Sequence, residues 1–388
     1  MIGATLSRMQ RGLQAYLGLI QFLFLLTWVV YVIFLEGMLV KLGLPKEFVP
    51  RLLLLDQLVF AFADVGLGFF ADRALRLWGR IAPLLVTLNV LSCAAFVALP
   101  FVPAGASWLF IGMTIFWVIT ASVLRAPLYG LIARRASQPA YGTAGALLGM
   151  GVASAMAPYL GQALKGIDPI LPFALCGVSL AVASVAFGGF ESRLREEKTA
   201  TGMTAPPRAR GLFRLLAMAL LLGLGMQLSV FVNAAPLYKG VADASLLPWV
   251  LPVFWIGFSV AVFPGARLID RQGARRTLVF SALAGSLATA ACLYGAGLTT
   301  LLILQSVAGV AWGMLFLSGL TLAGAMGNIG REALFAGAWF ACLAVGAMIR
   351  IGLGLAGVGF ASQFTLPLAA VLWLAGAALA VPWLRQTD

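Results

Sequence analysis

Four charged residues lie inside long apolar stretches of the chain: Asp56, Asp64, Arg125 and Arg350. A charge in such a stretch is costly, so it normally faces a cavity or a partner. The chain contains no histidine, and a proton that moves through its interior would therefore need a carboxylate. The two arginines offer planar donor forks that suit a carboxylate or a phosphate group. These four residues predict proton carriage and anion binding.

Asp64 and Arg125 each have two interpretations. Asp64 lies about fourteen residues, or roughly 20 Å, into an apolar stretch at 50–71, where a carboxyl group could act as a proton carrier. It could instead be the permanent partner of an arginine. Arg125 could bind an anionic substrate, or it could bond to backbone carbonyls that Pro127 leaves without a donor. The sequence leaves these alternatives open.

The composition determines the class of protein in which these residues act. Hydrophobic residues make up 62% of the 388 and charged residues 10%, whereas soluble domains are roughly a quarter charged. An integral membrane protein is therefore predicted. The net charge of +13 could suggest nucleic acid, but most of the 26 Lys and Arg residues fall in segments on one side of the apolar runs. This bias predicts a multi-pass protein of the cell inner membrane, with both termini cytoplasmic and no nucleic-acid partner.

Twelve apolar runs are long enough to cross a bilayer as helices, because about 20 residues span its hydrocarbon core. We expect the spans near residues 13–40, 50–71, 81–102, 107–133, 141–164, 169–190, 212–236, 246–266, 277–297, 299–324, 333–358 and 363–384. The charged stretch 191–210, which contains Pro206 and Pro207, is predicted to be a cytoplasmic linker. It would separate an N-terminal six-helix bundle at 1–190 from a C-terminal one at 211–388.

Two similar charged blocks follow the second and the eighth apolar runs. One contains Asp72 and Arg73, and the other contains Asp270 and Arg271. The aspartates lie 270 − 72 = 198 positions apart, about half of the 388 residues, so the chain is predicted to be a tandem repeat. We expect both blocks to be loops at the membrane surface, because so many charges cannot lie in the hydrocarbon.

These blocks resemble the Gly-x-x-x-Asp-Arg-x-Gly-Arg-Arg loop that joins helices 2 and 3, and again helices 8 and 9, of the major facilitator superfamily of transporters. The second block matches at Asp270, Arg271, Gly273, Arg275 and Arg276, and the first matches at Gly68, Asp72 and Arg73. The leading glycine of the second block is one place early, and the first block is stretched after its arginine. The resemblance implies an all-α membrane protein of bacterial type, with twelve transmembrane helices in two pseudo-symmetric six-helix bundles. It also implies that Asp72, Arg73, Asp270 and Arg271 act in gating.

In that family, helices 1, 4, 7 and 10 line a central cavity. The resemblance therefore places Arg125 in a substrate-binding cavity with polar and aromatic side chains of these helices, namely Trp28, Tyr31, Trp117, Gln227, Asn233 and Trp312. Helices 2 and 11 face one another across the two halves, and Asp56 and Arg350 lie on them at similar depths. An ion pair between Arg350 and Asp56, or less favourably Asp64, would close the outer side. Arg350 could instead bind an anionic substrate.

A secondary transporter that works by alternating access is the function these features favour. It would move a small organic solute, for which an organic anion is one candidate. Transport would be a symport or antiport coupled to protons. Two other functions stay open: an efflux carrier for lipophilic drugs, and a non-transporting assembly factor or receptor. An enzyme is not expected, because the chain lacks metal-ligand clusters, an activated nucleophile and a Walker loop. We expect a monomer in the lipid bilayer, without cofactor or metal.

Overall fold

The computed structural model describes residues 8–136, 138–197, 209–295, 297–327 and 330–384. Twelve segments of this described part are helical and apolar enough to cross a membrane, so the predicted number of spans is confirmed. They are Arg11–Lys41, Lys46–Trp78, Ala82–Phe101, Ser107–Arg135, Pro139–Ala163, Ile170–Ser192, Gly211–Lys239, Ala244–Gln272, Ala274–Tyr294, Leu298–Met326, Glu332–Leu355 and Ser362–Pro382.

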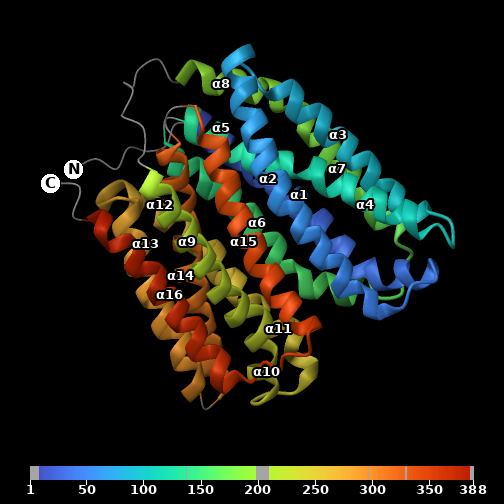
Figure 1. Ribbon diagram of the computed structural model, residues 1–388, viewed down its shortest axis with the longest axis vertical. Helices are drawn as coiled ribbons and strands as arrows, with labels where there is room; N and C mark the ends of the chain where they lie inside the picture. The colour runs from blue at the N-terminus through green and yellow to red at the C-terminus, as the bar shows by residue number, and fades with distance from the viewer. Residues whose placement is uncertain (1–7, 137, 198–208, 296, 328–329, 385–388) are drawn as a thin grey trace.

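The helices form two bundles (Figure 1). The N-terminal bundle consists of α1 (Arg8–Lys41), α2 (Val49–Trp78), α3 (Ala82–Ala98), α4 (Ser107–Ala121), α5 (Ala126–Arg135), α6 (Pro139–Ala163), α7 (Ile170–Val185) and α8 (Phe187–Glu197). The C-terminal bundle consists of α9 (Ala209–Met226), α10 (Ala234–Lys239), α11 (Leu247–Val250), α12 (Pro252–Gln272), α13 (Ala274–Ala291), α14 (Leu298–Met326), α15 (Glu332–Leu355) and α16 (Ser362–Leu384). The predicted linker thus begins inside α8, and its residues 198–208 lie outside the described residues.

The bundles meet at the end of the molecule where α1 begins and α16 ends, which we call the termini end. From there they diverge toward the opposite end, the far end, where α10 and α11 lie (Figure 1). Glycines make the contact between α2, α5 and α15 close: Gly68 and Gly130 both pack on the backbone of Ala333. On the other side of the molecule α6 packs on α12, with Gly151 against Phe258. The bundles are therefore joined mainly along α2–α15, α5–α15 and α6–α12. On the α6 side the contact continues to the far end, where Tyr159 of α6 packs on Trp249 of α11.

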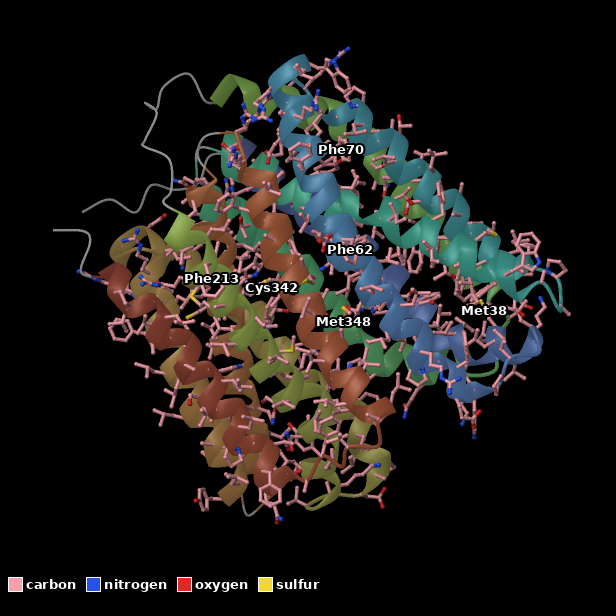
Figure 2. All side chains as sticks on the ribbon, in the orientation of Figure 1. Met38, Phe62, Phe70, Phe213, Cys342 and Met348 are labelled. Carbon is pink, nitrogen blue, oxygen red and sulfur yellow. The ribbon has the colours of Figure 1, made fainter. Side chains whose placement is uncertain are left out.

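The outer surface of both bundles is apolar. Phe62, Phe70 and Phe213 project from the molecule in Figure 2, with exposed fractions of 74%, 60% and 77%. A water-soluble protein rarely exposes contiguous apolar surface on this scale. The surface therefore suits the hydrocarbon of a bilayer.

Both charged blocks are helical, so the expectation that they are loops was wrong. Asp72 lies inside α2, which continues to Trp78, and Asp270 lies inside α12, which continues to Gln272. The turn after α12 is the single residue Gly273, whose φ of 86° lies in the left-handed region that favours glycine. Charge density locates the membrane boundary, but a helix can extend past that boundary into water or onto a polar partner, as both of these do.

Gly149 of α6 provides a test of the close packing inside the N-terminal bundle. A methyl group there would overlap the carbonyl oxygen of Gly18 in α1, whereas one at Gly161 of the same helix would meet open space. We expect Gly149→Ala to lower the free energy of unfolding by about 1–3 kcal/mol, because overpacking forces the helices apart. Gly161→Ala should leave it nearly unchanged. Thermal unfolding in detergent measures both, and equal melting temperatures would contradict this packing.

Candidate functional site

An ion pair lies where the two bundles meet. Arg125 Nη2 is 3.1 Å from Asp64 Oδ2 of α2; the Asp64 side chain is fully buried and that of Arg125 is 16% exposed. Two opposite charges in contact offset much of the penalty for removing each from water, whereas either one alone would be strongly unfavourable. In this conformation Asp64 therefore has an arginine partner, which is compatible with both alternatives that the sequence left open.

A break in the fourth span positions Arg125. The residue lies between a 3₁₀ turn at Ser122–Leu124 and α5. Pro127 causes the break, because it has no amide hydrogen and its ring clashes with the carbonyl four residues earlier. Gln21 Nε2 of α1 donates a 2.6 Å hydrogen bond to the carbonyl of Leu124 at this break. The amide of Gln21 thus serves a freed carbonyl, and the guanidinium of Arg125 is directed to Asp64.

Two phenylalanines, one from each bundle, enclose the guanidinium of Arg125. Its central carbon is 4.5 Å from the ring centroid of Phe60 in α2 and 4.9 Å from that of Phe340 in α15. A cation over an aromatic face is attracted by the ring quadrupole, and the attraction strengthens where water is excluded. Arg125 therefore interacts with both bundles at once.

A cavity of about 200 Å³ lies beside Arg125, between the bundles. Gln21, Gln57 and Arg125 contribute polar groups to its lining. The remaining lining residues are apolar or aromatic: Phe24, Leu25, Trp28, Phe60, Trp117, Ala121, Met150, Phe316, Phe340 and Leu343. A mostly apolar cavity with a few convergent polar groups is the usual character of a small-molecule site.

Among the predicted aromatic residues, Trp28 and Trp117 line this cavity, with their rings stacked 6.1 Å apart. Tyr31 is buried behind them, and its hydroxyl donates a 3.0 Å hydrogen bond to Asp56 Oδ2. Trp312 is buried inside the C-terminal bundle, stacked between Phe316 and Trp373. Neither Tyr31 nor Trp312 is part of the lining.

The other predicted polar residues form a second group in the C-terminal bundle, around a π-helical segment, η4 (Gln227–Asn233). Arg350 Nε donates a 2.8 Å hydrogen bond to Gln227 Oε1. Asn233 donates to the carbonyl of Leu228 and accepts from Thr365 Oγ1. Asp56 and Arg350 therefore have separate partners here. Their ion pair was predicted for the conformation in which the outer side is closed, and it stays a prediction.

Asp72 connects the bundles at the termini end. Its carboxylate accepts hydrogen bonds from the backbone N–H groups of Ala333 (3.1 Å) and Leu334 (2.9 Å), in the first turn of α15. The residue at the N-cap position of α15, Arg331, makes no side-chain capping bond. A carboxylate at a helix N-terminus satisfies unpaired donors and interacts favourably with the helix dipole. α15 is therefore capped by the other bundle.

The equivalent residue of the second repeat has a related contact. The side chain of Tyr141, in the first turn of α6, lies near the carboxylate of Asp270 in α12. Arg73 and Arg271, which follow the two aspartates, are exposed. Asp72 is therefore buried against the other bundle, whereas Asp270 is exposed beside Tyr141 of the other bundle.

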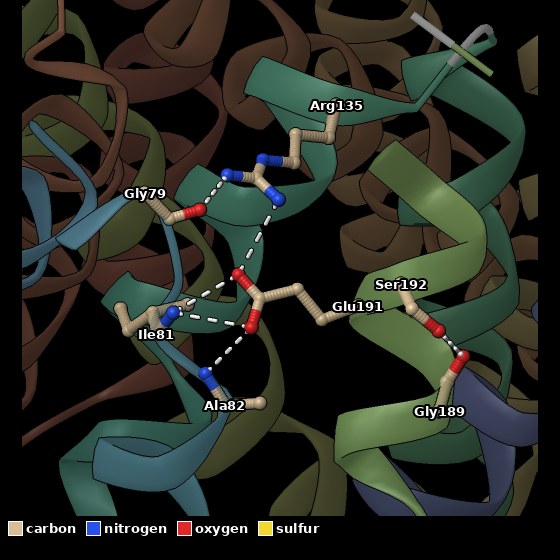
Figure 3. Close-up of polar contacts among 7 residues, drawn as sticks. All are labelled: Gly79, Ile81, Ala82, Arg135, Gly189, Glu191 and Ser192. Atoms are coloured by element: carbon tan, nitrogen blue, oxygen red, sulfur yellow. Dashed lines mark hydrogen bonds and ion pairs between the residues drawn. The ribbon is translucent and has the colours of Figure 1, made fainter. Parts of the chain in front are cut away.

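Glu191 is a buried carboxylate that the sequence analysis did not single out. It accepts hydrogen bonds from the backbone of Ile81 and Ala82 at the start of α3, and lies 3.4 Å from Arg135 of α5 (Figure 3). Arg135 also donates to the carbonyl of Gly79. These contacts tie α3, α5 and α8 together. The sequence did contain a signal for this residue, namely a single acidic side chain directly after an apolar run. The sequence analysis placed Glu191 in the linker at 191–210 instead.

The ion pair can be tested by removing one partner and then both. Arg125→Gln leaves Asp64 buried without a counter-charge, so we expect a loss of about 3–5 kcal/mol in the free energy of unfolding. Adding Asp64→Asn should restore most of it, since no charge then remains. Arg73→Gln, at an exposed arginine of α2, is the matched control. Thermal unfolding of the purified variants measures the effect, and a double variant no more stable than Arg125→Gln would contradict this account.

No protein-family model matches the sequence, and no curated protein matches it. Many solved structures are similar to it, and two of them match over nearly their whole length. The human organic anion transporter MFSD10 (TETRAN) has a TM-score of 0.72 and 13% identity, covering 96% of this chain and 100% of its own. The E. coli fucose:proton symporter FucP has a TM-score of 0.63 and 14% identity, covering 95% and 98%. The chain therefore has the fold of the major facilitator transporters, as predicted.

Proposed function

We propose that this protein is a secondary transporter that moves a small organic solute across the cytoplasmic membrane by alternating access. One observation carries the proposal. The cavity beside Arg125 is lined by both bundles, with Phe60 and Trp117 from the N-terminal bundle and Phe316 and Phe340 from the C-terminal bundle. A site in that place can open to one side when the bundles separate at the far end, and to the other when they separate at the termini end.

The orientation follows from the distribution of arginines. With both termini in the cytoplasm, the far end would face outward, and the end at which Asp72 bonds to α15 would face the cytoplasm. The hydrogen bonds from α15 to Asp72 then belong to the closed inner side, and they must break before the inner side opens. These hydrogen bonds are few and lie at a helix end. They can therefore stabilise the closed inner side and still break when the bundles move.

A small organic anion with an apolar body is the substrate class that the cavity suits best. The aromatic lining can take the apolar body, and Arg125 can take the anionic group. That the similar MFSD10 is described as an organic anion transporter supports this choice. An anion that binds Arg125 would replace the carboxylate of Asp64 as the counter-charge of the guanidinium. Asp64 could then accept a proton. The substrate and one proton would cross together.

An efflux carrier for lipophilic compounds is the second candidate. The observation in its favour is the aromatic character of the lining, in which Trp28, Trp117 and Phe316 could stack on an apolar cation. The charge balance is against it, because the carboxylate of Asp64 is already paired with Arg125.

Transport in proteoliposomes tests the proposal. The probe is radiolabelled benzenesulfonate, an aromatic anion that is permanently charged and does not cross lipid unaided. We expect an acidic outside medium to drive its accumulation. Asp64→Asn should abolish the accumulation, because no carboxyl remains to take the proton, but should leave exchange of the probe across the membrane. Glu36→Gln, at an exposed carboxylate of α1, is the comparison and should leave the accumulation unchanged. Accumulation of the cation ethidium in place of the anion would overturn the substrate class.

Closure of the termini end can be tested in two ways. Asp72→Asn removes the charge at the start of α15, and Gly337→Ala places a methyl group against the carbonyl oxygen of Asp64. Both should increase the population that is open at the termini end, about 2- to 30-fold for a capping interaction of roughly 0.5–2 kcal/mol. Spin labels at Leu77→Cys and Arg276→Cys, both exposed near that end, should report longer distances. Gly352→Ala, in open space on α15, is the control.

If neither change alters the distance distribution, the contacts of Asp72 and Gly337 are structural and do not gate the protein. If Gly352→Ala alters it as much, α15 responds to any substitution and the two contacts are not special.

A further inference from the structure

We propose that Arg350, Gln227 and Phe231 form a second anion-binding site, nearer the far end than the central cavity, which takes the sulfonate, carboxylate or phosphate group of an organic anion. The inference rests on the proposed function in one respect, since it makes this site the first station of a substrate arriving from the far end. Its binding of anions can be measured without transport.

The contacts of Arg350 leave its donor fork uncommitted. Nε is bound to Gln227 Oε1 at 2.8 Å, which fixes the direction of the guanidinium. The central carbon lies 5.3 Å from the ring centroid of Phe231. Neither terminal nitrogen has a hydrogen-bond or ion-pair partner among the described residues. A guanidinium fork held by one bond and one ring is arranged for a planar two-oxygen acceptor.

Arg350 lies on the cavity side of α15. Phe340 and Leu343 of this helix line the central cavity. Arg350 follows Leu343 by seven residues, which is two helical turns, so it shares that face about 10 Å closer to the far end. Its side chain is half-buried, and the ring of Phe231 is 53% exposed. The site is therefore reachable where the bundles diverge, and it continues the line of the central cavity.

The two arginines differ in charge balance. Arg125 is neutralised by Asp64 at 3.1 Å, whereas no acidic side chain of the described residues lies within 4.0 Å of Arg350. An unbalanced charge at membrane depth is unfavourable and is stabilised by any counter-ion that can reach it. An arriving anion should therefore bind Arg350 before it competes with Asp64 for Arg125. The exposed ring of Phe231 offers an apolar surface for the rest of the molecule.

The backbone of the seventh span is shaped around this group. Pro236 has no amide hydrogen, and its ring excludes the carbonyl of Val232 from a normal helical turn, which accounts for the π-helical form of the preceding residues. The bonds from Asn233 to Leu228 and from Thr365 to Asn233 hold that form. Gln227 and Phe231 are both part of this segment. Their positions beside Arg350 are therefore held by bonds that do not involve Arg350 itself.

Equilibrium binding of radiolabelled benzenesulfonate to the full-length protein in nanodiscs tests the site. Arg350→Gln should weaken binding about tenfold or more, as expected for loss of a charge-assisted pair. Gln227→Glu keeps Arg350 but places a carboxylate on it, so it should weaken binding to a similar degree. The matched control is Arg51→Gln, which removes an exposed arginine in the first turn of α2, on the side of the molecule where the far end lies. It should leave the affinity unchanged, and the uncharged benzenesulfonamide should not compete.

Three results would overturn the site. Wild-type protein could show no saturable binding, Arg350→Gln and Gln227→Glu could bind as wild type does, or Arg51→Gln could weaken binding as much, which would indicate general surface charge. Failure of the proposed transport function gives a different result from failure of the Arg350 site. In that case benzenesulfonate binds and the binding depends on Arg350, but no uptake occurs in proteoliposomes. If both inferences hold, Arg350→Gln raises the KM for outside benzenesulfonate about tenfold and changes kcat little.

Discussion

The buried ion pair between Asp64 and Arg125 is the constraint on which the centre of this protein depends. A single charge at that depth would be strongly unfavourable, so each residue requires the other. Arg125 can reach Asp64 because Pro127 breaks the fourth span there and Gln21 takes the carbonyl of Leu124. The pair also lies where the two bundles touch, since Phe60 of one bundle and Phe340 of the other both contact the guanidinium.

The contact between the bundles is close but makes few specific bonds. Glycines at 68, 130 and 337 let α2, α5 and α15 approach through their backbones, and the carboxylate of Asp72 adds two hydrogen bonds at the end of α15. Packing of this kind in a bilayer depends on van der Waals fit rather than on hydrophobic burial, because lipid is as apolar as the helix surface. Such an interface can separate as a unit, which a protein that rocks between two states requires.

Much of the fold was predictable, because hydropathy reports directly which segments lie in lipid. The twelve spans follow from it, whereas the two bundles were implied by the repeated aspartate blocks and their resemblance to the major facilitator family. The ends of α2 and α12 did not follow, since a charged residue can leave the hydrocarbon and remain helical. The pairing of Glu191 with Ile81 and Ala82 joins residues about a hundred positions apart. Hydropathy also could not separate Trp28 from Tyr31, because spans that are apolar all round have no distinguishable face.

In the proposed transport cycle the two arginines would serve two different steps. Arg125 is balanced by Asp64, so an anion could bind it only by displacing a carboxylate, and that exchange would connect substrate binding to proton uptake. Arg350 has a neutral amide and an aromatic ring beside it, so an anion can bind it without displacing a charge. The first site suits coupling and the second suits capture. An anion that passes from Arg350 to Arg125 would move from the C-terminal bundle to the N-terminal one, and while in transit it would attract both bundles. That attraction would favour closing the far end only when substrate is present, which is what a coupled transporter needs to avoid leakage.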